Sequence, residues 1–484
     1  MQVKNHFGID FGTTNSSVVQ IMSGLGHENE LRHGDDEGRP LPSIVAIDKD
    51  TGVVYTGRDA WKKRNELSQS CEIIPSVKSI LDDKDWSKFI AGKKWTATDV
   101  AAEVFKGLRK ALYSHDVNMA QATVAVPIGF SPEKREALRA AAKKAGITVE
   151  SFVSEPAAAF FANYDELKSA EHVVIFDWGG GTLDVSVLEH KGGTVRELAT
   201  GGMYVAGDDI DKQLALKIHD KVARDHDVHI SFEEMDAQSR DMLLVRAERA
   251  KRALSEEDDT VVSLNRYGEI GAFHIRVTYE WFAAIVESIV DRAIACLEST
   301  IEDSGEPLAN IDRVVMVGGS SNIGPLLDKM EDKFGDKLFF PDETVWSISQ
   351  GAARLSKRPG TYLSAQSVGL RLADNSYFPL LKPGDKVVGW EKALDFGIVE
   401  NAEELRVVFS GSKDIDNDSD RYQSVAVPGY LFLEEKLRLE AYIDEDLVFC
   451  VRMKSTMRQQ KDTVVWRYDR LKLTYSLGGE QDVR

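Results

Sequence analysis

Two glycine-rich stretches decide the fold: FGIDFGTTNSSVVQI at residues 7–21 and VVIFDWGGGTLDVSVLE at residues 173–189. Each has an apolar run, an aspartate, one further residue, glycine and threonine at a tight turn, and a second apolar run. This pattern predicts a strand, a glycine-rich turn and a returning strand. Two such copies far apart in one chain indicate a duplicated lobe with a ligand between the halves.

Helix and strand patterns alternate between and after these stretches, as in α/β folds. TVAVPIGF at 123–130 predicts a buried strand, and Ser131 followed by Pro132 predicts the start of a helix that closes on Gly146. Further on, DMLLVRAERAKRAL predicts another helix, and IDRVVMVGGSSNIGPLLDKM predicts strand, glycine turn and helix. This alternation continues to about Ala353.

The pattern changes after residue 355. LSKRPGTYLSAQ contains Pro359 and Gly360 and no long periodic run, which predicts a domain boundary. Beyond it apolar residues recur at every second position, the period of half-buried strands, and predict a small β-sandwich or barrel. The alternating residues are Leu437, Leu439, Ala441 and Ile443, then Leu447, Phe449, Val451 and Met453, then Leu471, Leu473 and Tyr475. The acidic stretch KDIDNDSDRY is predicted to be a solvated loop, because it lacks the glycine and glutamate of an EF-hand.

Composition excludes several classes of protein. The 484 residues are 43% hydrophobic, and no apolar run approaches the roughly 18 residues of a membrane span. A net charge of -19 disfavours nucleic acid and anionic lipid as partners. The first residues lack a secretory signal, so a cytoplasmic protein is expected. Cys71, Cys296 and Cys450 form no metal-binding spacing and are expected to be core residues.

The two turns offer the chemistry that a polyphosphate needs. Gly12, Thr13 and Thr14 in one turn, and glycines 179–181 with Thr182 in the other, can present backbone NH groups to phosphate oxygens. Asp10, Asp177 and Asp184 lie beside these turns and would repel phosphates unless a cation intervened, so the pattern predicts ATP with Mg²⁺ held largely through water. Either motif alone could equally be an ordinary glycine hairpin with a capping aspartate; the pair disfavours that alternative.

About the first 355 residues resemble the nucleotide-binding domain of the heat-shock-protein-70 (DnaK-like) chaperones. GIDFGTTNSSV and FDWGGGTLDVSV resemble its two phosphate loops, ERAKRALS its nucleotide-contacting helix and VVMVGGSSNI its adenosine segment. VPIGFSPEKREALRAAAKKAG and SEPAAAFF are similar to its crossover region, with Pro127, Arg135 and Glu155 at the expected spacing. The resemblance implies an α/β fold: an actin-like, two-lobed ATPase domain of duplicated ribonuclease-H-like fold. Its lobes would span about 1–170 and 171–355, with a linker at 356–366 and a β-sandwich at 367–484.

The same resemblance assigns roles around the phosphates. Asp10 and Asp177 would hold hydrated Mg²⁺, and Thr182 would lie near the terminal phosphate. Lys78, in IIPSVKSIL, would stand beside the attacking water and the γ-phosphate; taken alone, it reads as a surface lysine. Glu155 would organise the water shell of the metal, or serve as a first-turn glutamate favoured by the helix dipole. The remaining phosphate-binding positions would be Gly12, Thr13, Thr14, Asn15, Gly179, Gly180 and Gly181.

Two further segments would hold the nucleoside. In ERAKRALS, four side chains recur at i, i+3, i+4 and i+7, on one helix face that could embrace ribose and adenine; an ordinary charged face has the same spacing. These side chains are Glu248, Lys251, Arg252 and Ser255. Gly207, with Asp208, resembles the family's loop linking the smaller subdomain, and Asp211 is expected to cap or pack locally. Gly318, Gly319, Ser320 and Asn322 form the adenosine segment, and K⁺ is a further candidate ion.

Three features depart from the family. Asn322 stands where an arginine usually covers one face of the adenine, which puts nucleotide affinity in doubt. The linker region is polar, with only Leu363 in place of a leucine-rich run, so coupling between the domains is expected to differ. No long helical pattern follows the C-terminal strands, and a short or divergent family member without the helical lid is expected.

The leading functional hypothesis is a slow, Mg²⁺-dependent, chaperone-like ATPase whose nucleotide state modulates protein or peptide binding by the β-domain. Its partners would be an unfolded or specific client and a J-domain or nucleotide-exchange protein. The alternative is a nucleotide-gated regulatory protein that binds one folded partner. A small-molecule kinase or a filament-forming ATPase ranks lower, because the ERAKRALS helix and the β-domain disfavour both alternatives.

Overall fold

The computed structural model describes residues 4–24, 27–35, 38–113, 117–357, 361–397, 404–410, 422–429, 435–457, 462–469 and 471–476. Pro359, Gly360 and all but the last residue of the acidic stretch 413–422 lie outside these ranges. The chain divides into two compact units. Unit 1 contains Met1–Gly129, Ala137–His190 and Leu198–Lys357, and unit 2 contains Phe130–Glu136, Lys191–Glu197 and Arg358–Arg484.

The first lobe of unit 1 is built on a mixed sheet with the order β11-β10-β1-β2-β3, and β4 also pairs with β2. The hairpin β1–β2 is antiparallel, whereas β10 pairs parallel to β1 and β11 parallel to β10. The strands are β1 (Lys4–Phe11), β2 (Asn15–Gly24), β3 (His27–His33), β4 (Leu41–Pro42), β10 (Gln121–Val126) and β11 (Thr148–Ser154). Two small sheets complete the lobe: β5 (Val45–Asp48), β6 (Val54–Thr56) and β7 (Cys71–Ile74), and the hairpin β8 (Ser87–Ile90) with β9 (Lys93–Thr96).

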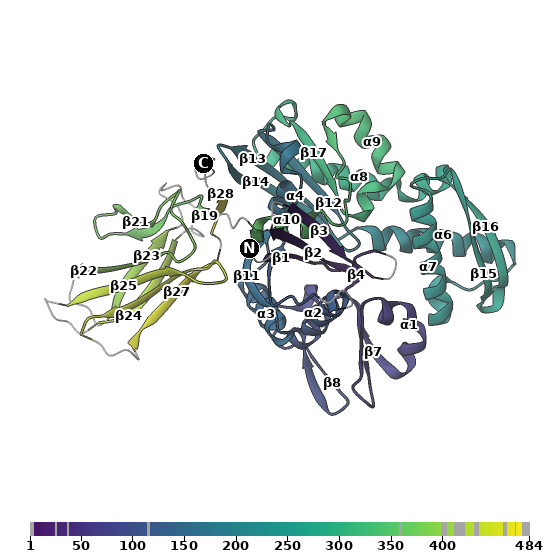
Figure 1. The fold of residues 1–484 in the computed structure, drawn as a ribbon, viewed down its shortest axis with the longest axis horizontal. Coiled ribbons are helices and arrows are strands. Elements are labelled where there is room, and N and C mark those ends of the chain that lie inside the picture. The colour runs from purple at the N-terminus through teal and green to yellow at the C-terminus, as the bar shows by residue number, and fades with distance from the viewer. Residues whose placement is uncertain are drawn as a thin grey trace. The chain divides into compact units, whose positions relative to one another are not determined.

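The second lobe repeats this topology, and Figure 1 shows its sheet beside that of the first. Five strands follow the order β18-β17-β12-β13-β14, with an antiparallel hairpin β12–β13 and the parallel pairs β12–β17 and β17–β18. They are β12 (His172–Trp178), β13 (Leu183–Lys191), β14 (Thr194–Met203), β17 (Arg313–Val317) and β18 (Leu338–Phe339); a separate hairpin joins β15 (Asp259–Tyr267) to β16 (Gly271–Thr278). The duplication predicted from the two glycine-rich stretches is confirmed.

Helices begin where the sequence supplies a cap. Ser131 Oγ accepts a hydrogen bond from Lys134 N before α3, Ser154 Oγ accepts from Ala157 N before α4, and Asp236 accepts from Ser239 N before α7. Gly146, at φ 76°, follows the end of α3. The helices are α1 (Gly57–Ser70), α2 (Ala97–Tyr113), α3 (Pro132–Lys144), α4 (Glu155–Ala162), α5 (Tyr164–Leu167), α6 (Gly207–Asp225), α7 (Ala237–Ala253), α8 (Tyr279–Asp303), α9 (Gly324–Phe334) and α10 (Ser347–Lys357).

Two glycines let α10 pack closely in the middle of unit 1. A Cβ atom at Gly351 would overlap the backbone carbonyl of Ala158 in α4. A Cβ atom at Gly8 of β1 would overlap the backbone of α10 at Ser349 and Ala353. Because α4 in turn packs on β12, these close contacts fix the two lobes of unit 1 against one another.

Unit 2 contains a β-sandwich. Its sheets have the orders β21-β20-β23-β24 and β22-β25-β26-β27, and one apolar cluster includes buried residues of both. Phe409 and Trp466 stack across it with ring centroids 3.8 Å apart. The strands are β20 (Val368–Arg371), β21 (Tyr377–Leu381), β22 (Glu391–Gly397), β23 (Glu404–Ser410), β24 (Tyr422–Pro428), β25 (Lys436–Ile443), β26 (Phe449–Ser455) and β27 (Val464–Tyr468). β19 (Thr361–Ser364) pairs with β28 (Leu473–Ser476), so part of the predicted linker is a strand.

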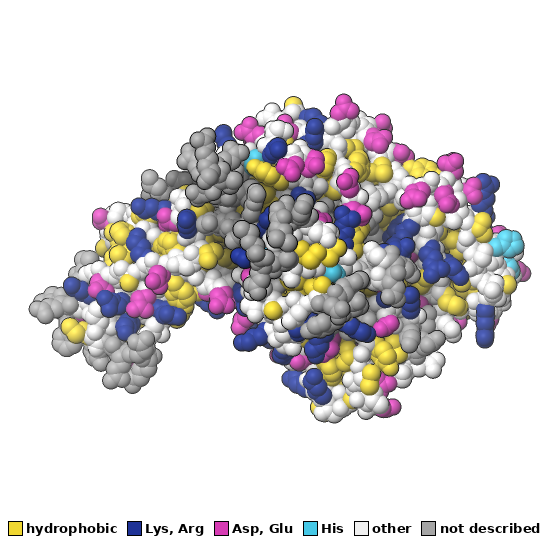
Figure 2. All heavy atoms as spheres, in the orientation of Figure 1, with side chains coloured by type: hydrophobic (Ala, Val, Ile, Leu, Met, Phe, Trp, Pro, Cys, Tyr) yellow, Lys and Arg dark blue, Asp and Glu magenta, His cyan; other side chains and the backbone are white. Residues whose placement is uncertain are grey.

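The surface carries both signs of charge. Acidic and basic side chains lie interspersed on the face shown in Figure 2. Within the described ranges, no helix is long and apolar enough to cross a membrane. Cys71 and Cys450 are buried, as expected of core residues, and Cys296 is half-buried.

Candidate functional site

The two predicted phosphate turns lie against one another. A Cβ atom at Gly180 would lie 2.6 Å from Thr14 Oγ1, and one at Gly181 would lie 3.2 Å from Thr13 Cγ2. The turn of the first lobe therefore contacts the turn of the second through its two threonines. A side chain at Gly180 would clash with Thr14 and one at Gly181 would press against Thr13, so glycine lets the two turns approach this closely.

Each turn is held in shape by its own backbone. A side chain at Gly12 would overlap the carbonyl of Asn15, the exposed first residue of β2, and Gly179 N donates to Thr182 O at 3.0 Å. Ser43 supports the first turn from outside, since its N donates to Thr14 O and its Oγ donates to Gly12 O. Hydrogen bonds within the protein therefore support both turns.

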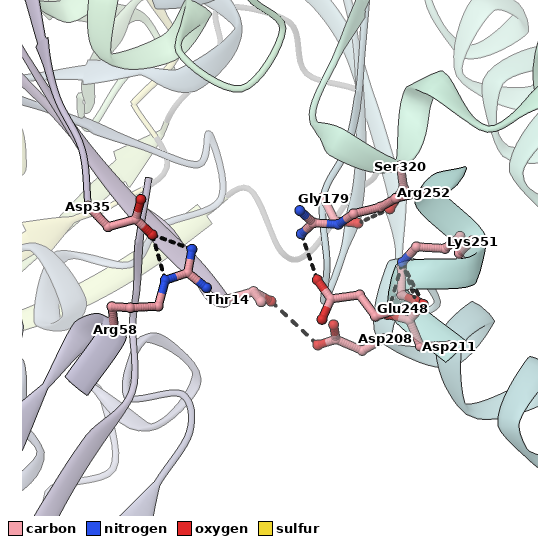
Figure 3. Close-up of polar contacts among 11 residues, drawn as sticks. Thr14, Asp35, Arg58, Gly179, Asp208, Asp211, Glu248, Lys251, Arg252 and Ser320 are labelled. Carbon is pink, nitrogen blue, oxygen red and sulfur yellow. Dashed lines mark hydrogen bonds and ion pairs between the residues drawn. The ribbon is translucent and has the colours of Figure 1, made fainter. Parts of the chain in front are cut away.

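The start of α6 joins the second turn. Gly207 N donates to Gly179 O at 3.1 Å and Asp208 N donates to Gly180 O at 2.8 Å. Thr14 Oγ1 donates to Asp208 Oδ2 at 3.4 Å, so this contact links the two lobes (Figure 3). Burial is the main reason that the pKa of Asp208 is raised to about 6.

Four acidic side chains and one lysine gather beside the turns. Asp10 lies near the end of β1, and Asp177 and Asp184 are directly paired across the hairpin β12–β13. Glu155 is the first residue of α4, and its Oε1 lies 2.8 Å from Lys78 Nζ. Their side chains are only 11% exposed for Lys78 and 9% for Glu155, so the ion pair is largely removed from water.

Burial and mutual repulsion determine the protonation of this cluster. Burial raises the pKa of Asp10, and the pKa of Asp177 is raised well above its ordinary value by burial and by Glu155, Asp184 and Asp10. The pKa of Glu155 is raised to about 7 by burial, although Lys78 opposes this shift. Burial alone would lower the pKa of Lys78, but the carboxylates outweigh it, so the ammonium stays charged.

The cluster contains more carboxyl groups than cationic groups. One ammonium does not balance four carboxyl groups, and a divalent cation would lower the raised pKa values of Asp10, Asp177 and Glu155. In the described part of the chain, no group of three or more His, Cys, Asp or Glu side chains is placed to hold a metal ion. Carboxylate oxygens are ligands that suit Mg²⁺, which usually keeps most of its water when it binds to proteins.

The polar residues of the predicted nucleoside helix differ in how deeply they are buried. Lys251 is buried, and its Nζ contacts Asp211 Oδ1 at 2.8 Å and Gly207 O at 3.1 Å. Burial is the main reason that the pKa of Asp211 is raised to about 6. Glu248 and Arg252 form an exposed pair at 2.6 Å. α7 ends at Ala253, and Ser255 follows in the next turn, where its Oγ donates to Lys251 O at 3.4 Å.

The adenosine segment folds as the 3-10 helix η5 (Gly319–Asn322) after a glycine turn. Gly318 has φ 83°, and a Cβ atom there would lie 2.6 Å from Asp177 Oδ1. Ser320 Oγ donates to Gly179 O at 2.8 Å, and Asn322 Nδ2 donates to Thr344 Oγ1 at 3.2 Å. This segment therefore borders both the carboxylate cluster and the second phosphate turn; Figure 3 shows Ser320, Gly179 and Arg252 together.

Sequence reasoning missed two ion pairs near these elements. Arg58 Nε donates to Asp35 Oδ2 at 2.6 Å in the first lobe, and Arg64 Nε lies 2.8 Å from Asp241 Oδ1 of α7. No local sequence pattern predicts either pair, because the partners are 23 residues apart in the first pair and 177 residues apart in the second. The roles predicted for the site residues stay predictions; the structure adds that these residues are brought together.

More than half of the sequence matches a known protein family. The sequence model of the family described as Hsp70 protein matches residues 81–356, which is more than half of the chain. The matched region includes the second phosphate turn, α7 and η5.

Proposed function

Because the chain belongs to the Hsp70 family, whose members are ATPases of the chaperone type, we propose that it is a slow, Mg²⁺-dependent ATPase whose nucleotide state modulates protein binding by its β-sandwich. The nucleotide-binding, chaperone-type function follows from family membership. Magnesium dependence, the slow rate, the site residues and the gating of a client are the parts that we propose.

The contact between the two phosphate turns carries this proposal. Thr13 and Thr14 face Gly180 and Gly181 across the two lobes, so both turns can present backbone NH groups to one polyphosphate. Asp10, Asp177 and Glu155 interact electrostatically with one another, and we expect them to face the ion that is bound to the phosphates. An ordinary glycine hairpin would require neither this pairing nor the carboxylates.

Lys78 is the residue that we expect to act on the reaction itself. Its ammonium is buried, charged and held 2.8 Å from Glu155 Oε1, so it can stabilise negative charge that develops on the terminal phosphate. Mg²⁺, when bound, would supply further charge neutralisation at the phosphate oxygens. Thr182 closes the second turn through its carbonyl, and we expect its hydroxyl to contact the terminal phosphate.

Single-turnover hydrolysis of ATP tests this assignment. We expect Lys78→Ala to reduce the hydrolysis rate by about 10²–10³-fold, the usual loss of one charge-stabilising group, with a much smaller change in ATP affinity. Thr182→Ala should also slow hydrolysis, and chelation of Mg²⁺ should abolish it. Lys84→Ala is the matched control, since Lys84 is an exposed lysine of the same segment. Equal rates for the Lys78 variant and this control would contradict the assignment.

The role of the β-sandwich needs a separate measurement. The same hydrolysis is followed with and without a mixture of extended apolar peptides. Acceleration by peptide would support coupling between nucleotide and client. Tight ATP binding without any peptide response would instead favour the nucleotide-gated protein that binds one folded partner, and a pull-down with the full chain in ATP and ADP would then identify that partner.

A further inference from the structure

Two carbonyl groups of the second phosphate turn are occupied by the protein itself. Gly179 O accepts hydrogen bonds from Gly207 N at 3.1 Å and from Ser320 Oγ at 2.8 Å. Gly180 O accepts one from Asp208 N at 2.8 Å. Gly207 and Asp208 are the first residues of α6, where a helix has NH groups without intrahelical partners. These two NH groups therefore hold the turn from behind and are not directed at an anion.

The planarity of the peptide bond converts this arrangement into a constraint on the neighbouring NH groups. In a trans peptide, the carbonyl of one residue and the NH of the next point in opposite directions. Since Gly179 O and Gly180 O face α6 and η5, the NH groups of Gly180 and Gly181 point away from both elements. In the part of the chain that the structure describes, neither NH donates to a protein acceptor, and both residues are partly exposed. These two NH groups can therefore bind the oxygens of a polyphosphate.

Ser320 is enclosed at the point where α6, η5 and the second turn meet. Its side chain belongs to a residue that is only 4% exposed, and a Cβ atom at Gly207 would lie 2.5 Å from its Oγ and 3.2 Å from Gly179 O. Figure 3 shows Ser320 directed at Gly179. The resemblance placed Ser320 in the adenosine segment, but its single O–H donor is used by the backbone of the phosphate turn.

The charged side chains near this junction have partners of their own. They are Lys251 with Asp211, Arg252 with Glu248, and Asp208, which accepts a hydrogen bond from Thr14 Oγ1. The Ser320 hydroxyl is uncharged and contacts the turn directly. Its removal therefore alters the support of the turn without taking a charge away from the site.

We propose that Ser320 is a positioning residue of the phosphate site. Its hydroxyl holds the Gly179 carbonyl against η5, and this contact fixes the peptide planes whose NH groups, at Gly180 and Gly181, bind the polyphosphate. Ser320 thus acts through the turn and determines the affinity for the phosphate chain, without contacting the ligand. The inference rests on the proposed function, because it requires a polyphosphate at the two turns.

Competition against a fluorescent ADP analogue, with the full chain and Mg²⁺, separates phosphate binding from nucleoside binding. The competitors are tripolyphosphate and adenosine. We expect Ser320→Ala to weaken tripolyphosphate by about three- to tenfold, the usual contribution of one hydrogen bond, and to leave adenosine unchanged. The loss stays moderate because Gly179 O keeps its hydrogen bond from Gly207 N. Ser304→Ala is the matched control: Ser304 Oγ also donates to a backbone carbonyl, Ile301 O, and we expect no change in either affinity.

A pair of variants with the same shape tests whether the hydroxyl itself is responsible. Ser320→Thr and Ser320→Val both introduce a branch at Cβ, but only the first keeps the O–H donor. We expect Ser320→Thr to bind tripolyphosphate about three- to tenfold more tightly than Ser320→Val. Any disturbance caused by the extra branch is common to both variants, so the difference between them still reports the hydrogen bond.

The outcomes separate this proposal from the one on which it rests. Equal tripolyphosphate affinities in wild type and Ser320→Ala, or in Ser320→Thr and Ser320→Val, would overturn the positioning role and leave the ATPase intact. Weakening of adenosine in Ser320→Ala, alone or together with tripolyphosphate, would also overturn it, because Ser320 would then act on the nucleoside or on the site as a whole. Failure of tripolyphosphate to displace the fluorescent ADP analogue from the wild type would contradict the phosphate site itself.

Discussion

Arg64 Nε of α1 lies 2.8 Å from Asp241 Oδ1 of α7, although the two residues are 177 positions apart. The guanidinium of Arg64 also lies over the ring of Trp61, 3.9 Å from its centroid, and donates to the carbonyl of that residue. The side chains are 15% and 24% exposed. A partly buried, pre-oriented arginine therefore connects the two lobes of unit 1.

Breaking this ion pair should speed nucleotide release. We expect Arg64→Ala to increase the dissociation rate of ADP by about two- to tenfold. In this variant the two lobes can separate without breaking an ion pair worth about 0.5–1.5 kcal/mol. Stopped-flow fluorescence with a labelled ADP measures the rate. Lys106→Ala is the control, since Lys106 pairs with Glu103 inside one helix. If the double variant with Asp241→Ala shows additive effects, the two side chains do not act as a pair.

Glu155 should make the nucleotide-free protein lose stability as the pH rises. The pKa of Glu155 is about 7 in the folded protein against an ordinary value of 4.5, so the folded state keeps a proton that the unfolded chain releases between these values. The contribution to the free energy of unfolding is complete below about pH 4.5 and is lost as the pH rises through 7. Thermal unfolding between pH 5 and 8 should show this decline in the wild type relative to Glu155→Gln. Parallel pH curves for the two proteins would refute it.

The packing of α10 on α4 predicts a sharp steric penalty. Gly351→Ala places a methyl group on the carbonyl of Ala158, so we expect unit 1 to lose about 1–3 kcal/mol or more in free energy of unfolding. Chemical denaturation measures the loss. Gly129→Ala is a suitable comparison, because a Cβ atom there has no atom within 4 Å. Similar stabilities of the two variants would show that the helices can separate at low cost.

The β-sandwich should depend on the ring pair at its centre. Phe409 is completely buried and stacks on Trp466, so Phe409→Ala should cost about 3–5 kcal/mol. Calorimetry of the full chain should show the loss in the transition of unit 2. Val465→Ala, at a half-exposed position next to Trp466 on β27, should change stability by about 0.5 kcal/mol or less. A loss confined to the transition of unit 1 would argue against two separate cores.

The glycine-rich turns show why so much of the fold was predictable. Strand, turn and returning strand follow from apolar runs around Asp10 and Asp177, because the constraints on φ and the approach of the backbone act within a few residues. Helix starts at Ser131 and Ser154 were equally local. The strand at Thr361–Ser364 was not predictable in this way, since a short polar segment becomes a strand only when it finds its partner, Leu473–Ser476.

The helix around Lys251 shows a feature that local sequence did not predict. Its spacing allowed a nucleoside-binding face or an ordinary charged face, and the structure shows that one of its polar side chains is buried in an ion pair with another helix. Lys251 turns inward to Asp211 of α6, while Arg252, its neighbour, remains exposed. Spacing specifies which side chains share a face of a helix, but not which of them is buried against a neighbouring element.

Short-range chemistry was therefore enough to specify two phosphate-type turns, the duplicated lobes and an alternating β-domain, because each depends on residues within one hairpin or helix. Packing between distant elements decided which charges meet. Lys78 reaches Glu155 across 77 positions, and Thr14 meets Gly180 and Asp208 of the other lobe. Such contacts depend on how whole lobes fold against each other, and no run of neighbouring residues encodes that arrangement.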